Sequence, residues 1–372
     1  MLTLNRKDMA VSFTSLTSNT YYTSDLQTIG VSATTVQVEF RIYYQARIYY
    51  SGDGRELIFS STYYPQNNTL TIYDVADIIE NFMRKRTQSI EKFVLVLSGN
   101  SDSIEQEITC IYCKQRLLQP TSADLLNDYF LTTHASRLVP TNAEIRLSFY
   151  IPTGSAGGYA TVGTTYTITY IKANGEAAQT QRTNYTRMGY GVQEIFFDYS
   201  YLQTMFSNYI PSDAVIVSVL VKTGNRLCRI YFTQRNDLHK FWFHNAFNCL
   251  DFVYLATTRV VKTETKSSIA NLCTHKAQYD VQHTRSYEET TSQLTKDEAV
   301  WLTEMLTSHY IAVEDDGDEE EILITDYKAE TTDEQGEGNT IEFTWQYASV
   351  RYMLGKDEFS RIFTKEYKEP FA

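Results

Sequence analysis

The chain has 372 residues, which is long for one ordinary domain and predicts two or three. Hydrophobic residues make up 42% and aromatic residues 14%, with 29 Tyr, 19 Phe and only 6 Pro, a composition that favours pleated strands over helices. The net charge of −12 is segregated: Thr295–Ala372 has 20 acids and 7 bases, whereas the rest has 25 acids and 26 bases. Such a segment repels phosphate backbones, which argues against a nucleic-acid partner; plain solubility is the alternative explanation of its charge.

Targeting signals are not evident. The chain contains no apolar run of the roughly 18 residues that a membrane helix needs, and its start, MLTLNRKDMAVSFTS, lacks the apolar core of a secretory signal. We therefore expect synthesis in a bacterial cytoplasm without a signal peptide, and no membrane insertion. Five scattered cysteines do not resemble a secreted disulfide scaffold, so free thiols are the simpler expectation.

Two segments of the chain resemble each other and predict an internal duplication. TIYDVADIIENFM at 71–83 aligns with IFFDYSYLQTMFS at 195–207 at an offset of 124. The same offset places FVLVL at 93–97 on VSVLV at 217–221, so two apolar strands match without a gap.

The similarity extends to both ends of the copies. IYCKQR at 111–116 corresponds to IYFTQR at 230–235, and the opening strands at 36–45 and 143–152 correspond loosely. Short β-branched and aromatic runs between turns such as ANG predict hairpins within each copy.

One helix is expected in each copy, headed by an aspartate that can cap its first turn. The apolar residues that follow at helical spacing are Val75, Ile78, Ile79 and Phe82 after Asp74, and Tyr199, Leu202, Phe206 and Tyr209 after Asp198. The predicted fold is mainly β: two antiparallel β-sandwich units, 1–119 and 140–237, each with a short crossover helix. A linker at 120–139, with a short helix in ADLLNDYFL, would separate them.

Residues 238–372 are predicted to form an acidic α+β domain. It opens with the aromatic cluster HKFWFHNAFNCLDFVYL, which is either an exposed docking patch or core. Thr295–Ser308 is the clearest helix, with Thr295 and Glu298 as a capping box and Ala299, Leu302, Met305 and Leu306 as an apolar stripe.

An acidic loop follows this helix, in which seven of the eight residues from Glu314 to Glu321 are acidic. It lacks the ligand spacing of an EF-hand, so a solvated loop is favoured over calcium binding. Neutralisation by the basic surface of a partner is a third possibility. The residues predicted as a candidate interaction surface are Trp242, Phe243, Phe247, Glu314, Asp315, Asp316, Asp318 and Glu319.

Catalytic and metal-binding motifs were sought along the chain. Cys110 and Cys113 form a CxxC, but they fall in a predicted strand rather than at the start of a helix, and the position that matches Cys113 is Phe232. Only Cys273 and His275 would be plausible further ligands. No nucleophile-elbow, phosphate-loop, dinucleotide or HExxH pattern occurs. We predict no catalytic residue, metal or cofactor, and a non-enzymatic protein; a carboxylate pair assembled in space stays open.

The order of features resembles that of tail-region structural proteins encoded by phages and prophages of Bacteroidetes. The features are the two sandwich repeats, the segment FWFHNAFNCLDFVY, and WLTEMLTS followed by ILITDYKAE and IEFTWQYAS. Relatives often carry a glycine in the asparagine-containing aromatic segment, where this chain has Ala246 and Asn248. The resemblance implies a virion component that assembles with other tail proteins.

Two functional hypotheses follow. The first is a structural protein of a phage or prophage tail or baseplate that acts through protein–protein contacts, as a homo-oligomer or with other virion proteins. The second is a carbohydrate-binding adhesin or receptor-binding protein, because β-sandwiches with exposed aromatic side chains can stack on sugars of a glycan receptor.

Overall fold

The computed structural model describes residues 11–45, 54–100, 102–115, 117, 119–152, 158–235, 237–272, 275–315, 318–330 and 338–348. It is mainly β, as predicted, and the described residues include four α-helices. The chain divides into two compact units: unit 1 comprises Met1–Arg137, Thr141–Phe232 and Asn245–Cys249, and unit 2 comprises Leu138–Pro140, Thr233–His244 and Leu250–Ala372. The domain boundaries proposed above remain predictions.

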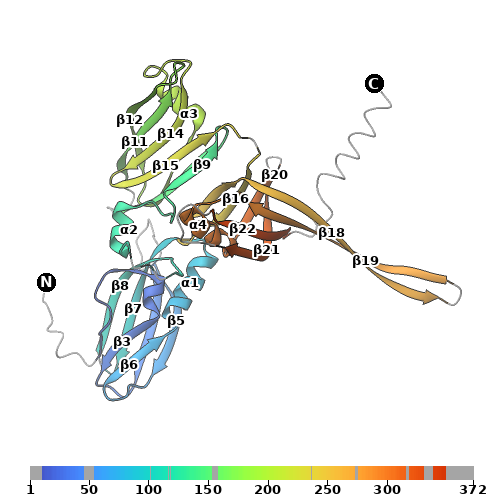
Figure 1. Ribbon diagram of the computed structural model, residues 1–372. Helices are drawn as coiled ribbons and strands as arrows, with labels where there is room; N and C mark the ends of the chain where they lie inside the picture. The colour runs from blue at the N-terminus through green and yellow to red at the C-terminus, as the bar shows by residue number, and fades with distance from the viewer. Residues whose placement is uncertain are drawn as a thin grey trace. The chain divides into compact units, whose positions relative to one another are not determined.

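The first sandwich of unit 1 has two sheets, with strand orders β1-β3-β6 and β2-β8-β7-β4-β5 (Figure 1). Its elements are β1 (Val11–Phe13), β2 (Thr20–Tyr22), the 3-10 helix η1 (Thr23–Leu26), β3 (Thr28–Ala33), β4 (Val38–Gln45), β5 (Arg55–Tyr63), β6 (Thr69–Tyr73), α1 (Val75–Lys85), β7 (Ile90–Gly99) and β8 (Asp102–Ile111). Every second residue of β4 is buried, as expected for a strand with one face on the core. Both sheets and α1 contribute to that core, for example through Ile29, Phe40 and Ile79.

The second sandwich has strand orders β10-β13 and β12-β11-β14-β15-β9. Its elements are α2 (Ser122–Asp128), β9 (Ser136–Pro140), β10 (Glu144–Ile151), β11 (Ala160–Ile171), β12 (Ala177–Met188), β13 (Gly191–Asp198), α3 (Tyr199–Phe206), β14 (Val215–Thr223) and β15 (Arg226–Thr233). Tyr166 of one sheet contacts Phe197 of the other edge to face, with ring centroids 5.3 Å apart. The short helix expected in ADLLNDYFL is confirmed as α2, and the Thr121 side chain accepts a hydrogen bond from the Asp124 N–H at 3.2 Å.

The two five-stranded sheets share one strand order when β9, β15, β14, β11 and β12 are matched to β2, β8, β7, β4 and β5. The matched strands FVLVL and VSVLV lie in β7 and β14, as predicted. The correspondence of the opening strands is wrong, because 36–45 contributes β4 to the large sheet whereas 143–152 contributes β10 to the small one. Apolar alternation alone does not distinguish a strand of one sheet from a strand of the other.

The helices α1 and α3 differ at their heading aspartates. The Asp198 side chain accepts a hydrogen bond from the Tyr201 N–H at 2.6 Å, as predicted for a cap. Asp74 instead has φ 65°, in the left-handed region, and its side chain makes no capping hydrogen bond. The prediction is therefore wrong for Asp74, because a capping residue usually has an extended backbone and that of Asp74 is left-handed.

Unit 2 contains one seven-stranded sheet of order β17-β16-β20-β21-β22-β19-β18. Its elements are β16 (His239–His244), β17 (Leu250–Leu255), β18 (Thr257–Leu272), β19 (His275–Thr291), α4 (Lys296–Leu306), β20 (Ile311–Asp315), β21 (Asp318–Glu330) and β22 (Thr340–Tyr347). The capping box of α4 is confirmed: Thr295 Oγ1 accepts from the Glu298 N–H at 3.3 Å, and Glu298 Oε2 accepts from the Thr295 N–H at 2.8 Å. The predicted stripe of α4 is buried in the core beside Phe241 and Phe343.

Candidate interaction surface

Trp242 and Glu314, two residues of the predicted surface, lie together on β16 and β20. Lys240 Nζ contacts Glu314 Oε2 at 2.5 Å and lies 4.3 Å from the centroid of the Trp242 ring. The indole N–H of Trp242 donates to the same carboxylate oxygen at 3.3 Å. The cross-strand pairs Lys240–Glu314 and Trp242–Ala312 place these side chains on one face of the sheet. Because Trp242 is only 7% exposed, it is not the open aromatic patch that was considered.

Phe243 is wholly buried on the opposite face of the same strand. Its ring lies 6.0 Å from that of Trp301 of α4, within the core of unit 2. Alternate residues of a strand point to opposite faces, so Phe243 cannot share a surface with Trp242. The prediction that Phe243 belongs to an interaction surface is wrong.

Phe247 is also buried, in a core cluster of unit 1 that includes Leu125 and Cys249. Asn245 Oδ1 accepts from the N–H groups of Phe247 and Cys249 at 3.0 and 3.1 Å, and Asn245 Nδ2 donates to the Leu131 carbonyl at 2.8 Å. Asn248 has φ 56°, a left-handed conformation that Asn tolerates better than other residues with a side chain. This asparagine-held turn fixes Phe247 in the core, so its assignment to a surface is wrong.

The acidic run forms a β-hairpin rather than the predicted loop. Glu314 and Asp315 end β20, Asp318 and Glu319 begin β21, and Asp316 lies outside the described residues. Glu314 is opposite Glu319, and Asp315 is opposite Asp318. Like charges directly opposite each other are unfavourable. Lys240 compensates at Glu314, and the hydroxyl of Tyr310 donates to Glu319 Oε1 at 2.6 Å.

The most prominent feature that the sequence did not predict is a two-stranded ribbon. β18 and β19 pair along their whole length, but β22 joins β19 only at Tyr287–Thr290. The remaining ribbon extends beyond its sheet (Figure 1). The twelve residues of His275–Ser286 span about 40 Å at about 3.4 Å per residue. The sequence signal that could have predicted this ribbon is the long β-branched and polar run at 257–291, which contains no Pro or Gly.

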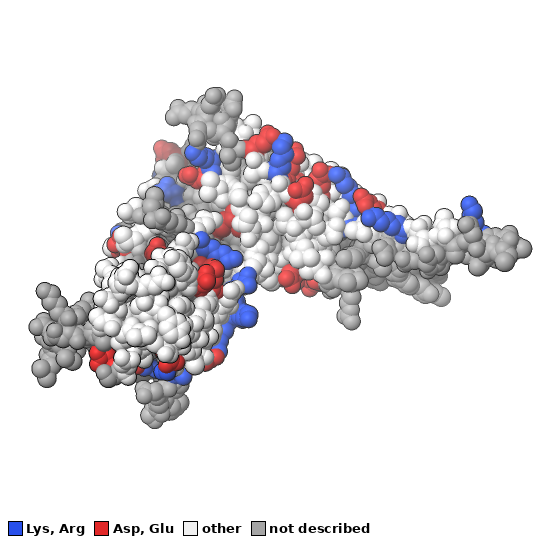
Figure 2. Space-filling model, turned by 90° about the horizontal axis from the view of Figure 1, so that it is seen from below, with Lys and Arg blue, Asp and Glu red and all other residues white. Residues whose placement is uncertain are grey.

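This projecting ribbon exposes apolar side chains and open strand edges. Ile269 is 61% exposed along it, and Val260 and Val261 are 48% and 43% exposed at its base, opposite Glu288 and Tyr287. Figure 2 shows Lys and Arg side chains along it. Within the described residues, no third strand pairs with β18, or with β19 before Tyr287. Unpaired N–H and C=O groups on such an edge can pair with a strand of another chain.

A buried carboxylate anchors the base of the ribbon. Glu289 accepts hydrogen bonds from Arg259 Nε at 2.5 Å and Trp345 Nε1 at 3.2 Å, and it also bonds to Thr257 and His239. Burial alone raises the pKa of the Glu289 carboxyl, but these bonds outweigh it and lower that pKa to about 2. Glu289 is therefore an ionised structural group of the core.

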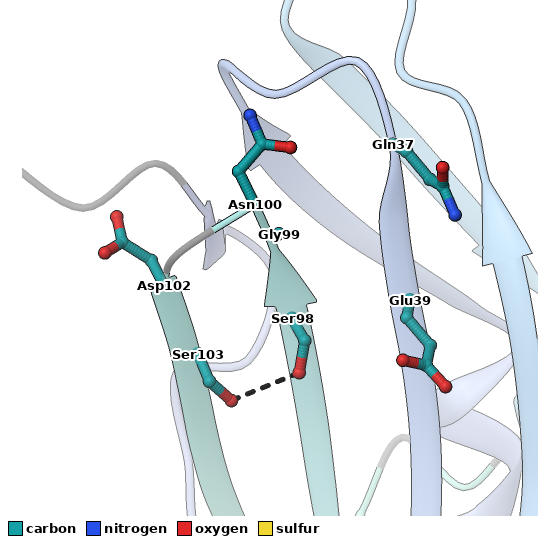
Figure 3. A pocket seen from close by; sticks show the side chains of 7 residues that line it. All are labelled: Gln37, Glu39, Ser98, Gly99, Asn100, Asp102 and Ser103. Atoms are coloured by element: carbon teal, nitrogen blue, oxygen red, sulfur yellow. Dashed lines mark hydrogen bonds between the residues drawn. The ribbon is translucent and has the colours of Figure 1, made fainter.

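A shallow polar pocket of about 460 Å³ lies at one end of the first sandwich (Figure 3). Its lining residues are Gln37, Glu39, Ser98, Gly99, Asn100, Asp102 and Ser103. Ser98 and Ser103 bond to each other at 3.2 Å, and the Glu39 carboxylate is bonded by Arg41 Nε at 2.7 Å. The pocket has no apolar wall that would bury a small ligand.

Metal ligation has little support in the part of the chain that the structure describes. No group of three or more His, Cys, Asp or Glu residues there is arranged to hold an ion. Cys110 and Cys113 are buried, and burial raises the pKa of the Cys110 thiol. Cys273 lies outside the described residues. His244 and His309 face each other at 3.1 Å, and burial followed by the charge of His309 lowers the pKa of His244 to about 4.

Within the described helices, none is long and apolar enough to cross a membrane.

Comparisons with known proteins give only weak similarity. No protein-family model and no curated protein matches the chain. A chain from the virion of a native gene transfer agent particle has a TM-score of 0.21 at 12% identity, over 32% of this chain and 96% of that one. The calcium-binding domain CBD12 of CALX1.1 has a TM-score of 0.18 at 11% identity, over 58% and 79%. Trypsin-activated alpha-2-macroglobulin from Escherichia coli has 0.19 at 8% identity, over 78% and 23%. These scores identify neither a family nor a function.

Proposed function

We propose that this protein is a non-enzymatic structural component of a phage or prophage tail or baseplate, and that it assembles through protein–protein contacts. The observation that carries the proposal is the β18–β19 ribbon. A two-stranded ribbon has too little core to be stable alone, so a long projecting one is best explained by a partner that covers it. The resemblance of the chain's motifs to tail-region proteins supports the virion setting.

The ribbon is suited to insertion into a neighbouring subunit by strand addition. Its open edges supply main-chain hydrogen bonds, and Ile269 supplies an apolar contact, with Val260 and Val261 exposed at its base. The anchored base supports this role, because the Glu289 bonds hold the point from which the ribbon leaves the sheet. We propose a second copy of the chain as the first partner, in a homo-oligomer that other virion proteins join.

Shortening the ribbon tests this function. In the test variant, residues 265–283 are replaced by Asn-Gly, a two-residue turn suited to a hairpin. Glu264 and Thr284, which are paired in the full ribbon, then flank the new turn, and the base is retained. Sedimentation velocity of the full chain should show concentration-dependent oligomers, whereas the shortened variant should stay monomeric. Hydrogen exchange at β22 should be the same in both.

Two results would count against the proposal. One is a full chain that stays monomeric up to about 100 µM, a concentration at which even weak specific contacts form. The other is a shortened variant with the same oligomer distribution as the full chain, which would place the contact elsewhere.

A further inference from the structure

The outer face of the second sandwich's large sheet differs in charge from the rest of the molecule. Strands β11, β12, β14 and β15 contain no Asp or Glu, although acids outnumber bases 45 to 33 in the whole chain. Of their five basic residues, Arg187, Lys222 and Arg229 are exposed on the outer face, whereas Arg182 is paired with the core-facing Tyr166 and Arg226 is buried. The acid nearest in sequence, Glu176 at the β11–β12 turn, contacts Lys172 Nζ at 3.2 Å.

The strand register arranges this face in rows. Residues paired across antiparallel strands lie on the same face, and Tyr166 and Ile168 of β11 point into the core. The odd-numbered residues of β11 up to Thr169 therefore point outward, and so do the β12 residues paired with them. One outer row crosses four strands and consists of Thr183, Thr165, Lys222 and Leu227. The next row ends at Arg229.

Tyr185 provides an aromatic platform at one end of these rows. It is paired with Gly163, and its ring atoms lie 3.1 and 3.4 Å from the position that a Cβ of Gly163 would occupy. The ring therefore covers the glycine backbone, while 72% of the side chain stays exposed. Beside it, the Arg187 guanidinium lies 4.3 Å from the centroid of Tyr159, which is 58% exposed.

Polar side chains in the row of Lys222 and in the row beyond Arg229 are already oriented. Thr165 and Thr183 bond to each other at 2.8 Å, and Gln179 Nε2 donates to Thr169 Oγ1 at 3.1 Å. Hydroxyl and amide groups both donate and accept hydrogen bonds. They match the hydroxyl groups of sugars, which do the same.

The spacing of these groups requires an extended ligand. Strands lie about 4.8 Å apart and alternate residues about 6.8 Å apart, so the backbones at Tyr185 and Lys222 are about 12 Å apart and those at Tyr185 and Arg229 about 20 Å. One small molecule is too short to span groups at this spacing. A polymer that lies across the strands can contact the ring, the hydroxyls and the cations together.

We propose that this outer face binds an acidic polysaccharide, a polymer of uronic-acid sugars, with Tyr185 stacking on one sugar and Lys222 and Arg229 contacting carboxylates. The four strands contribute no acid to repel such a ligand, and the three exposed cations are spaced more widely than the phosphates of a nucleic acid. The proposal goes beyond tail assembly and does not depend on it.

Affinity electrophoresis and calorimetry with the full chain test the proposal, using polygalacturonate, dextran and the oligonucleotide dT15 as separate probes. We expect binding to polygalacturonate that weakens with salt, and little binding to dextran or dT15. Because the protein has a net charge of −12, its overall charge opposes binding to a polyanion, so retention would indicate a local site.

Variants locate the site. Tyr185→Ala and the pair Lys222→Gln with Arg229→Gln should each weaken polygalacturonate binding about tenfold, as expected for the loss of roughly 1.4 kcal/mol. Tyr185→Phe, which keeps the ring, should bind like the original. Tyr64→Ala is the matched control, because Tyr64 is 67% exposed in the first sandwich.

Several results would overturn the proposal. They are the absence of polygalacturonate binding, binding by the Tyr185→Ala and Lys222/Arg229 variants that equals that of the original chain, and binding to dT15 as strong as that to polygalacturonate. None of these results bears on ribbon-dependent assembly, so failure of one proposal is distinguishable from failure of the other.

Discussion

The base of the β18–β19 ribbon and its projecting part are made from the same two strands but are stabilised differently. At the base, Tyr287 stacks on Trp345 with centroids 4.1 Å apart, and Glu289 is wholly buried among donors. In the projecting part, Ile269 is exposed, and within the described residues the two strands pair only with each other. Pairing alone therefore does not stabilise a ribbon equally along its length; contact with a third strand and the core makes the difference.

The largest effect is expected from Glu289→Ala, with its neighbour Glu288 as the matched control. Loss of Glu289 leaves Arg259 and the indole N–H of Trp345 without their buried acceptor, which should cost unit 2 about 3–5 kcal/mol. Glu288 contacts Lys262 at 2.5 Å in a partly exposed pair, so Glu288→Ala should cost less than about 1 kcal/mol. Hydrogen exchange at β22 measures the stability of unit 2 separately from that of unit 1. Similar costs for both variants would show that the buried bonds of Glu289 do not anchor the base.

Acid should loosen the base before the rest of the ribbon. The pKa of Glu289 is lowered from 4.5 to about 2 in the folded chain, so the unfolded chain binds its proton first as pH falls. The stabilisation by Glu289 is complete above about pH 4.5 and is lost as pH falls towards 2. Unfolding followed between pH 6 and about 2 should show this loss in the original chain and in Glu288→Gln. A Glu289→Gln variant that loses stability just as steeply would contradict the assignment.

Trp345→Phe should have an intermediate effect. Phe keeps part of the stack on Tyr287 but removes the N–H that donates to Glu289, at an expected cost of about 1–2 kcal/mol. Combined with Glu289→Ala, it should cost less than the sum of the two single changes, since both remove the same bond. Additive costs would show that Trp345 stabilises the base through packing alone.

The smallest effect on folding is expected in the projecting part. Ile269 is 61% exposed, so Ile269→Thr should change the stability of unit 2 by no more than about 0.5 kcal/mol. If the ribbon docks on a neighbour, the same change should nevertheless weaken oligomers in sedimentation velocity. A clear loss of stability with unchanged assembly would reverse the roles assigned to the two parts.

Local patterns predicted much of the fold. The α4 capping box depends on residues three apart, and alternating apolar residues follow directly from strand geometry, so both could be recognised from sequence. The paired aspartates show the limit. Asp198 caps α3 whereas Asp74 is left-handed and does not cap α1, because the exit of β6 rather than the residue type sets the backbone there.

The candidate site was less predictable. Aromatic side chains in the 238–254 segment could be core or surface, and the alternation of β16 between two faces decided this for Trp242 and Phe243. The charge of the run from Glu314 predicts a solvated loop, yet Lys240 and Tyr310 allow its acids to pair in strands. Lys240 is 74 residues from Glu314, and the nearer Tyr310 meets Glu319 through the β20–β21 hairpin, so neither contact could be identified from sequence.

By itself, the sequence determined the β-rich class, the helix start at Thr295 and the segregation of acid in the C-terminal part, since these depend on composition and short-range spacing. Only the tertiary structure decided that Glu289 is buried, that β18 and β19 project, and that Tyr185 lies over Gly163. Those features depend on which distant strands pair and in which register. A one-residue shift would move every side chain of a strand to the other face.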